Sequence, residues 1–276
     1  MIITKDKIKA FKHHLITEEK SPLTVEKYVR DINIFSAYSG TNRVDKNVVV
    51  NYKTYLMERY AISSVNSMVS SLNCFFDFCN KNELKLKTIR CQRKMFIPEQ
   101  KNLTIKEYER LIDVAEGRMS LILQTICTTG IRVSELRFIT VESAISGLAE
   151  ISCKGKQRRI FLPKSLCEIL QDYAEQKNIF SGSIFLSNRG NPLDRSNIWS
   201  EMKSLCEKAR VLPEKVFPHN LRHLFAKTYY SSMKDIVRLA DVLGHSSLNT
   251  TRIYTAETGE IHRRQIEQLG QVKTHN

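Results

Sequence analysis

Four short stretches in the second half of the chain carry side chains that can act on a phosphate ester. In the first, TTGIRVSEL, Arg132 follows a glycine turn and Glu135 lies one helical turn later. A guanidinium group at the start of a helix can extend into a cleft, where its planar fork matches two phosphate oxygens. The same spacing also fits an ordinary surface ion pair between Arg132 and Glu135.

A basic turn forms the second stretch, SCKGKQRRI. It carries Lys154 and Lys156, and Arg158 and Arg159 follow as parts of the same basic finger. A lysine at this turn can bind a phosphate or donate a proton to a departing alkoxide. A solvated hairpin would have the same composition. The spacing leaves open whether Lys154 or Lys156 would reach a phosphate.

The third stretch is PHNLRH, in a helix predicted to begin near Pro218. His219 and Arg222 are three residues apart and share one face of that helix, and His223 falls near the same face. A histidine can accept or donate a proton near neutral pH. Taken singly, each of these histidines also fits a structural role.

The fourth stretch, LGHSSLNTTRIYT, contains a second possible proton-transfer or phosphate-binding group and a possible nucleophile. His245 follows a glycine that is typical of a helix end, and Tyr254 comes nine residues later in a short predicted helix over 247–254. A tyrosine oxygen can attack phosphorus. A tyrosine at helical spacing is also a common core or interface residue.

Apolar periodicity predicts that two domains position these groups. Residues 1–83 form four short predicted helices, in which apolar side chains such as Ile8, Phe11 and Leu15 recur on one face. Residues 84–101 are rich in lysine and arginine and form the predicted linker. Fully extended, these ~18 residues would reach roughly 60 Å, which is enough to pass across a DNA duplex.

The second predicted domain covers residues 102–276. Helical spacing recurs from Thr104 onward, two short strands flank the basic turn, and SIFLSNRGNPLDRSN is expected to hold a further short strand and a turn. A last polar helix is expected over 257–269. The predicted fold class is therefore mainly α with a small β-sheet.

The composition favours an intracellular protein that binds a polyanion. The 276 residues are 42% hydrophobic and 26% charged, and the net charge of +14 is spread over both halves of the chain. Such a distribution fits a nucleic acid that contacts both halves. The seven cysteines include no CxxC pair and no apolar run approaches ~18 residues, so we expect reduced thiols, no zinc site and no membrane partner.

In their order along the chain, these motifs resemble those of the tyrosine recombinase (phage integrase) family. HNLRH and LGHSSLNTTRIYT are highly specific, and SPLTVEKYVRDINIFSAY resembles the core-binding helix of that family. The resemblance covers nearly the whole chain, whose layout is similar to the short, two-domain Xer-type recombinases. It implies an all-α, SAM-like core-binding domain and an α+β catalytic domain that ends in an oligomerisation helix.

The resemblance also implies site residues and partners. The residues that match the catalytic set of the family are Arg132, Lys154, His219, Arg222, His245 and Tyr254, the last as nucleophile. No cofactor and no metal are implied. The implied partners are double-stranded DNA with a specific core site, further copies of the chain in a tetramer on two DNA sites, and an accessory protein or partner recombinase. The implied location is the cytoplasm, with the nucleoid.

The implied activity is site-specific recombination through a covalent 3′-phosphotyrosyl intermediate, in integration and excision, inversion or resolution of DNA. Three alternatives stay open. One is a type IB topoisomerase-like enzyme that relaxes DNA, and another is a catalytically inactive, architectural DNA-binding protein. The third is a metal-dependent nuclease that uses His219, His223 and His245. One departure from the family, the segment VESAISGLAE, leaves the start of the hairpin open.

Overall fold

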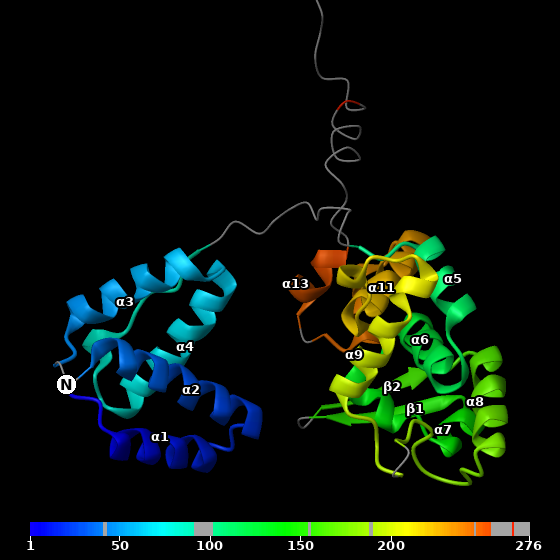
Figure 1. The fold of residues 1–276 in the computed structure, drawn as a ribbon, viewed down its shortest axis with the longest axis horizontal. Helices are drawn as coiled ribbons and strands as arrows, with labels where there is room; N and C mark the ends of the chain where they lie inside the picture. The colour runs from blue at the N-terminus through cyan, green and yellow to red at the C-terminus, as the bar shows by residue number, and fades with distance from the viewer. Residues whose placement is uncertain are drawn as a thin grey trace, which may run out of the picture. The chain divides into compact units, whose positions relative to one another are not determined.

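The computed structural model describes residues 1–40, 43–90, 102–153, 156–187, 190–245, 247–254 and Glu267. The chain divides into two compact units, Met1–Arg93 and Lys94–Asn276, which are drawn in Figure 1. Each unit has a hydrophobic core of its own. The two units are therefore described separately.

The N-terminal unit contains the four predicted helices. They are α1 (Lys5–Thr17), α2 (Pro22–Ser39), α3 (Lys46–Arg59) and α4 (Ile62–Phe78). Proline at the first position begins α2 without the loss of a hydrogen bond. Asp45 caps α3 by accepting a hydrogen bond of 2.9 Å from the backbone N–H of Val48. The fully buried rings at the centre of the unit are Phe11, Phe35, Tyr52, Phe75 and Phe76.

The first residues of the predicted linker pack on this unit. Leu86 is buried in its core. Two asparagines of α4 each donate to and accept from the backbone of this segment, Asn73 at Leu86 and Asn66 at Ile89, over 2.8–2.9 Å. These paired hydrogen bonds and the buried leucine hold the segment on the unit although it is basic. Residues 91–101 lie outside the described residues, and the exact bounds of the linker stay a prediction.

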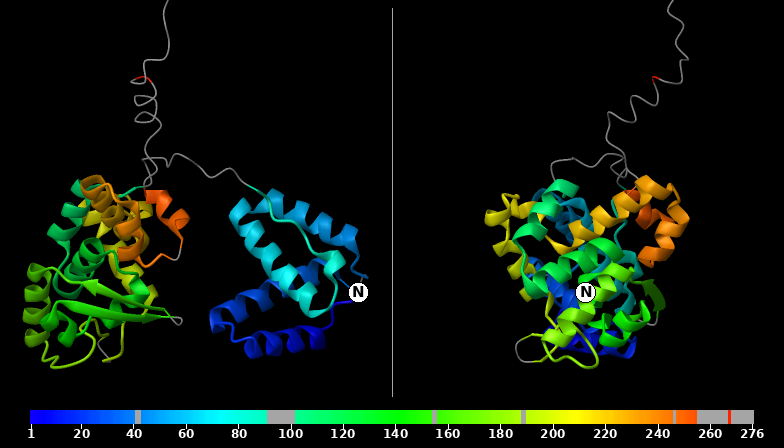
Figure 2. Two further views of the ribbon diagram at one scale, coloured as in Figure 1. Left: turned by 180° about the vertical axis from the view of Figure 1, so that it is seen from behind. Right: turned by 90° about the vertical axis from the view of Figure 1, so that its right-hand side faces the viewer.

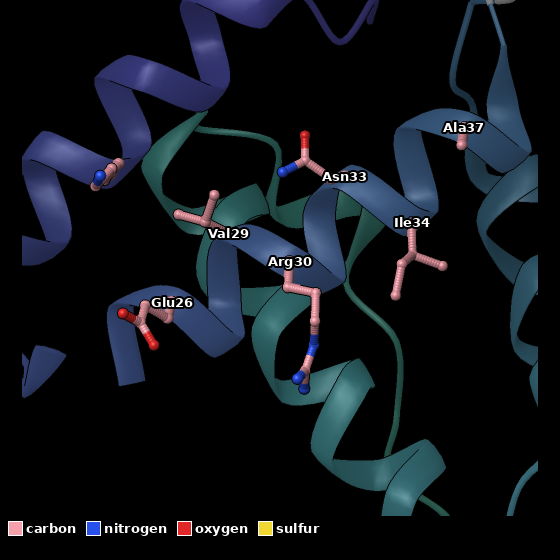
Figure 3. A pocket seen from close by; sticks show the side chains of 7 residues that line it. Glu26, Val29, Arg30, Asn33, Ile34 and Ala37 are labelled. Carbon is pink, nitrogen blue, oxygen red and sulfur yellow. The ribbon is translucent and has the colours of Figure 1, made fainter. Parts of the chain in front are cut away.

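A shallow groove lies along the exposed face of α2, as Figure 3 shows. Lys12 of α1 lines one side, and the lining residues from α2 are Glu26, Val29, Arg30, Asn33, Ile34 and Ala37. The groove combines an apolar floor with hydrogen-bond donors from lysine, arginine and asparagine. It can therefore make both polar and nonpolar contacts.

The second unit is mainly helical. Its longer helices are α5 (Ile105–Val114), α6 (Gly117–Thr129), α8 (Lys164–Gln176), α9 (Arg195–Ser204), α11 (Pro218–Met233) and α12 (Ile236–Leu243). The short helical segments are η3 (Val133–Phe138), α7 (Val141–Ser146), α10 (Cys206–Ala209), η4 (Pro213–Lys215), α13 (Leu248–Thr251) and η5 (Arg252–Tyr254). Among the described residues of both units, no helix has the length and apolar character needed to span a bilayer.

The predicted hairpin is present. Its strands β1 (Leu148–Cys153) and β2 (Lys156–Phe161) pair antiparallel. The atypical segment VESAIS forms α7, which ends at a left-handed glycine directly before β1. Strand β1 contacts α7, and the left panel of Figure 2 shows the hairpin from behind. The predicted fold class, mainly α with a small sheet, is confirmed.

The strand predicted in SIFLSNRGNPLDRSN is wrong. In the described part of the chain this segment makes only isolated bridges, Ser183 to Thr140 and Leu186 to Pro192. The bridge between Leu186 and Pro192 is flanked by two backbone hydrogen bonds, from the Ser187 N–H to the Asn191 carbonyl at 2.7 Å and from the Leu193 N–H to the Phe185 carbonyl at 3.3 Å. Pro192 therefore occupies a position where the pairing needs no N–H. The polar helix predicted over 257–269 lies outside the described residues, apart from Glu267.

Helix α6 lies at the centre of the second unit. Its buried side chains point in all directions and include Met119, Leu121, Ile122, Leu123, Thr125 and Ile126. A helix that is apolar all round must be covered on all sides, and α5, α8, α9 and α11 pack against it (Figure 1). This packing fixes the C-terminal end of α6 relative to α11. The candidate site forms there.

Candidate active site

Arg132 is positioned by a sharp turn after α6. Gly130 ends the helix in the left-handed conformation, with φ 63°, and an added Cβ would lie 2.4 Å from Cδ1 of Phe225. Only glycine fits both the backbone angle and this close approach. Arg132 then starts η3, and its backbone N–H donates to Oε2 of Glu135 at 2.9 Å. The chain thus turns back at the residue predicted to bind phosphate.

Glu135 is the buried carboxylate behind the arginines. It accepts from Nη1 of Arg132 at 2.9 Å and from Nη2 of Arg158 at 2.6 Å, and only 3% of it is exposed. Burial by itself raises the pKa of Glu135, but the Arg132 backbone N–H and the Arg158 charge outweigh this and hold the pKa below its ordinary value. The ion pair between Arg132 and Glu135 that the sequence allowed is therefore present, and its buried carboxylate orients two guanidinium groups.

Three consecutive carbonyls at the end of α12 each accept from a different arginine. The carbonyl of Val242 accepts from Arg158 at 2.7 Å, that of Leu243 from Arg222 at 2.7 Å, and that of Gly244 from Arg132 at 3.4 Å. The C-terminal end of a helix carries a partial negative charge. Together with the Glu135 carboxylate, it offsets the mutual repulsion of three cations in one place.

Arg222 lies at the bottom of the site and is only 4% exposed. It also donates to the carbonyl of Gly130, which joins α11 to the end of α6. Burial and the nearby charge of Arg132 lower the pKa of Arg222 to about 10, and Tyr254 opposes this shift. A group with that pKa stays positively charged at neutral pH. The buried Arg222 guanidinium can therefore bind an anion at neutral pH.

His245 joins Arg222 to the segment that carries Tyr254. Its Nε2 lies 3.0 Å from Nη2 of Arg222, and its Nδ1 lies 2.8 Å from Oγ1 of Thr251. A guanidinium can only donate, so Nε2 is the acceptor and Nδ1 carries the proton. Burial and the charge of Arg222 lower the pKa of His245 to about 4, so the ring is neutral at pH 7.

Tyr254 is buried against the site. It is 4% exposed, and its ring stacks on His245 with centroids 6.0 Å apart and planes 13° apart. The His223 ring meets it edge-on at 4.9 Å. Leu239 and Leu243 complete the apolar side of this cluster. Tyr254 is therefore both a packed residue, as the cautious interpretation held, and a neighbour of His245.

The predicted residues do not all lie in this cluster. His219 is exposed on the first turn of α11, one turn before Arg222. Loss of water around its ring and the charges of Arg222 and Arg195 lower the pKa of His219. Lys154 lies outside the described residues, so the structure does not distinguish it from Lys156. Of the six predicted residues, four form the cluster: Arg132, Arg222, His245 and Tyr254. His219 lies at its edge, close enough to Arg222 and His245 to interact electrostatically with both.

The sequence places Arg158 and Arg159 together in one basic finger, but the structure separates them, because the Arg158 side chain is 14% exposed and that of Arg159 is 70% exposed. On β2, Arg158 shares the inward face with the buried Ile160, whereas Arg159 points outward and pairs with the exposed Glu150 at 3.1 Å. An added Cβ on Gly244 would lie 2.5 Å from Cδ of Arg158, which shows how closely the two pack. The alternation of a strand around Ile160 was the sequence signal for this orientation.

Gly130→Ala is expected to destabilise the second unit by about 2–5 kcal/mol. The left-handed backbone angle costs an alanine about 1–2 kcal/mol, and crowding against Phe225 and Leu243 adds about 1–3 kcal/mol. Denaturant unfolding of the full chain measures the change. Gly182→Ala is the matched control, because Gly182 has φ 75° and no atom within 4 Å of an added Cβ. Equal losses in the two variants would mean that the close approach at Gly130 contributes nothing.

Comparison with protein families finds two matches. Residues 101–260 match the phage integrase family, and residues 8–83 match the N-terminal SAM-like domain of phage integrases. The chain belongs to the phage integrase family. The resemblance inferred from HNLRH and LGHSSLNTTRIYT is confirmed.

This phage integrase family member has relatives that match over most of their length. It is 29% identical over 272 residues to the tyrosine recombinase XerA of Pyrococcus furiosus, which covers 94% of this chain and 92% of that protein. It is 26% identical over 265 residues to the tyrosine recombinase XerD of Halalkalibacterium halodurans, over 85% of this chain and 87% of that protein.

Solved structures share the fold of this family member. A lambda integrase dimer bound to a COC′ core site gives a TM-score of 0.73 at 17% identity, over 92% of this chain and 95% of that one. The XerH recombinase bound to a palindromic difH substrate gives a TM-score of 0.70 at 19% identity, over 98% of this chain and 90% of that one. At these identities the likeness establishes the fold, and the chemistry rests on the side chains described above.

Proposed function

We propose that this protein is a site-specific DNA recombinase that cuts and rejoins DNA strands through a covalent 3′-phosphotyrosyl intermediate. The observation that carries the proposal is the stacking of Tyr254 on His245, which is itself bonded to the buried Arg222. A possible nucleophile thus lies directly against cationic groups suited to a phosphate. Relatives that match most of the chain are named tyrosine recombinases, which supports the same activity.

In the proposed reaction the Tyr254 oxygen attacks the scissile phosphorus. The bond from this oxygen to phosphorus forms, the bond from phosphorus to the 5′ oxygen breaks, and one DNA strand is left with a free 5′ hydroxyl. The tyrosyl ester keeps the bond energy of the phosphodiester. Attack by the 5′ hydroxyl of another strand can therefore reseal the DNA and release Tyr254 without ATP.

Arg132 and Arg222 stabilise the charge that develops on the two non-bridging phosphate oxygens. Both guanidinium groups are held in place before the DNA arrives, Arg132 by Glu135 and Arg222 by the carbonyl of Leu243. Donors that are fixed in advance need no reorganisation when the charge appears. His245, beside Arg222, is suited to hydrogen-bond one of the same oxygens.

The protons need a base and an acid. A phenol is protonated at pH 7, and His219 has a lowered pKa that keeps its ring neutral and able to accept the Tyr254 proton. By resemblance, Lys154 donates a proton to the departing 5′ oxygen. Lys156, two residues away, is the other candidate for that step.

We propose double-stranded DNA with a specific core site as the substrate. The lambda integrase and XerH structures are of complexes with a core site and with a difH substrate. The groove along α2 offers Lys12, Arg30 and Asn33, side chains that suit phosphates and base edges (Figure 3). The net charge of +14 favours the same partner.

The remaining features of the proposal rest on the resemblance. They are a tetramer on two DNA sites, an accessory protein or partner recombinase, a place in the cytoplasm with the nucleoid, and work on a mobile element or on inversion or resolution of DNA. The basic composition is compatible with each of them.

Formation of the covalent complex is expected to be unchanged in EDTA. Two arginines supply the charge that a metal would otherwise supply. In the metal-nuclease alternative His245 would have to act as a ligand, but its two ring nitrogens already contact Arg222 and Thr251. The measurement is the yield of denaturation-resistant protein–DNA complex with and without chelator. Loss of the complex in EDTA and its return with added Mg²⁺ would favour the nuclease.

A search for covalently attached DNA tests the proposal as a whole. The full chain is incubated with sheared DNA of its source organism, denatured in detergent, and the DNA that remains attached is sequenced. We expect a common core sequence linked through its 3′ end. Attachment at many unrelated sites together with plasmid relaxation would favour the topoisomerase, and tight binding without any attachment would favour the architectural protein.

A further inference from the structure

We infer that Thr251 is a positioning residue that, together with Arg222, fixes which ring nitrogen of His245 carries the proton, and so couples the docking of Tyr254 to the phosphate pocket. The inference deepens the proposed function and rests on it. The first observation is the contact itself, 2.8 Å between Thr251 Oγ1 and His245 Nδ1. Thr251 is completely buried, so no water competes for that contact.

The hydrogen-bond pattern fixes the state of the ring in the free protein. Arg222 donates to Nε2 of His245, so the Nδ1–H must donate to the Thr251 hydroxyl oxygen. A phosphate that engages Arg222 reverses the requirement, because His245 must then present a proton at Nε2. A hydroxyl can accept from Nδ1–H or donate to bare Nδ1. Thr251 therefore supports both forms of the ring, and a valine supports neither.

The same segment carries the proposed nucleophile. Thr251 ends α13 and Tyr254 lies three residues later in η5, so both residues reach His245 from one continuous piece of helix. Tyr254 covers the His245 ring face, while Thr251 holds its edge. If this piece leaves the site, His245 loses both contacts together. A subunit with Tyr254 withdrawn would thus also have a poorly oriented histidine for the phosphate.

Nitrogen NMR of the full chain tests the inference without DNA. Protein labelled with ¹⁵N-histidine reports, for each of its seven histidines, which ring nitrogen is protonated. His245→Gln identifies the signals of that residue. In the wild type we expect a neutral ring with the proton on Nδ1. In Thr251→Val we expect a mixture of the two tautomers, and in Thr251→Ser a return to the wild-type spectrum.

Thr250→Val is the matched control. Thr250 is the neighbouring residue on α13 and is exposed, so the same change there should leave the His245 signals unaltered. A wild-type ring protonated on Nε2 would overturn the inference, and so would an unchanged His245 spectrum in Thr251→Val. Thr251→Val can have a much lower melting temperature than Thr250→Val, and its spectrum would then report a disturbed fold. In that case the tautomer of the wild-type ring and the recovery in Thr251→Ser test the inference.

Cleavage of the recovered core DNA gives the second readout. Loss of one buried hydrogen bond of about 1 kcal/mol predicts an about fivefold slower covalent step in Thr251→Val with unchanged DNA binding, and recovery in Thr251→Ser. An unchanged rate despite altered tautomers would reject the positioning role. If even wild-type protein forms no covalent complex, the proposed function fails, and the NMR result then reports on Thr251 separately.

Discussion

Tyr254→Phe is expected to abolish covalent attachment to DNA and to leave DNA binding close to that of the wild type. The change removes one oxygen and keeps the ring that stacks on His245 and meets His223. The arginines that would hold the phosphate are untouched. Because the reaction has no second route once the nucleophile is missing, the rate should fall by at least ~10⁴-fold. Detergent-resistant complex and gel-shift affinity, measured on the same DNA, separate the two effects.

Tyr230→Phe is the control for this variant. Tyr230 of α11 packs against the same apolar cluster, and the Lys234 ammonium lies 5.5 Å from the centroid of its ring. The same loss of one hydroxyl there should leave cleavage unchanged. Covalent complex in Tyr254→Phe at the wild-type yield would show that another residue is the nucleophile. Sequencing the peptide attached to the DNA would then identify that residue.

The helical scaffold could be predicted because its signals are local. Each N-terminal helix has one apolar stripe of period 3.6, and the buried residues Ile8, Phe11 and Leu15 of α1 are those that the spacing selects. The basic turn between two strands was likewise visible. The strand predicted in SIFLS depended on pairing with a distant segment, and the one bridge of this kind among the described residues joins Ser183 to Thr140. Propensity carries no information about whether such a partner exists.

The site could be predicted only in part, for a similar reason. Arg132, Arg222, His245 and Tyr254 stand out because their residue types match a known chemical set in a known order. Arg158 does not belong to that set, so no motif identifies it. Arg158 and Arg159 are adjacent, and only the alternation of the strand around the buried Ile160 indicates which of them turns inward toward Glu135.

The supporting contacts were hidden as well, because they join segments far apart in the chain. The carbonyls of Val242, Leu243 and Gly244 accept from arginines 84, 21 and 112 residues away. No short motif encodes hydrogen bonds between segments that lie so far apart in the chain. The motif LGH nevertheless supplies the helix end that makes it possible, because the left-handed Gly244 terminates α12 directly before His245.

Arg222→Ala is expected to cost both stability and catalysis. The lost guanidinium leaves the buried carbonyls of Gly130 and Leu243 without their donor, which predicts a loss of about 2–4 kcal/mol in the free energy of unfolding. Removal of one of the two donors to the phosphate oxygens predicts a cleavage rate about 10²–10³-fold lower at saturating DNA. Unfolding in denaturant measures the first effect, and single-turnover cleavage measures the second.

Arg132→Ala separates these two effects. The Arg132 side chain is 42% exposed, and without it Glu135 still accepts from Arg158 and from the backbone N–H of residue 132. The stability loss should therefore be smaller than in Arg222→Ala, while the loss in cleavage rate should be similar. If the cleavage rates of the two variants instead follow their stabilities, the arginines act by holding the fold together, and their proposed contact with the phosphate would be rejected.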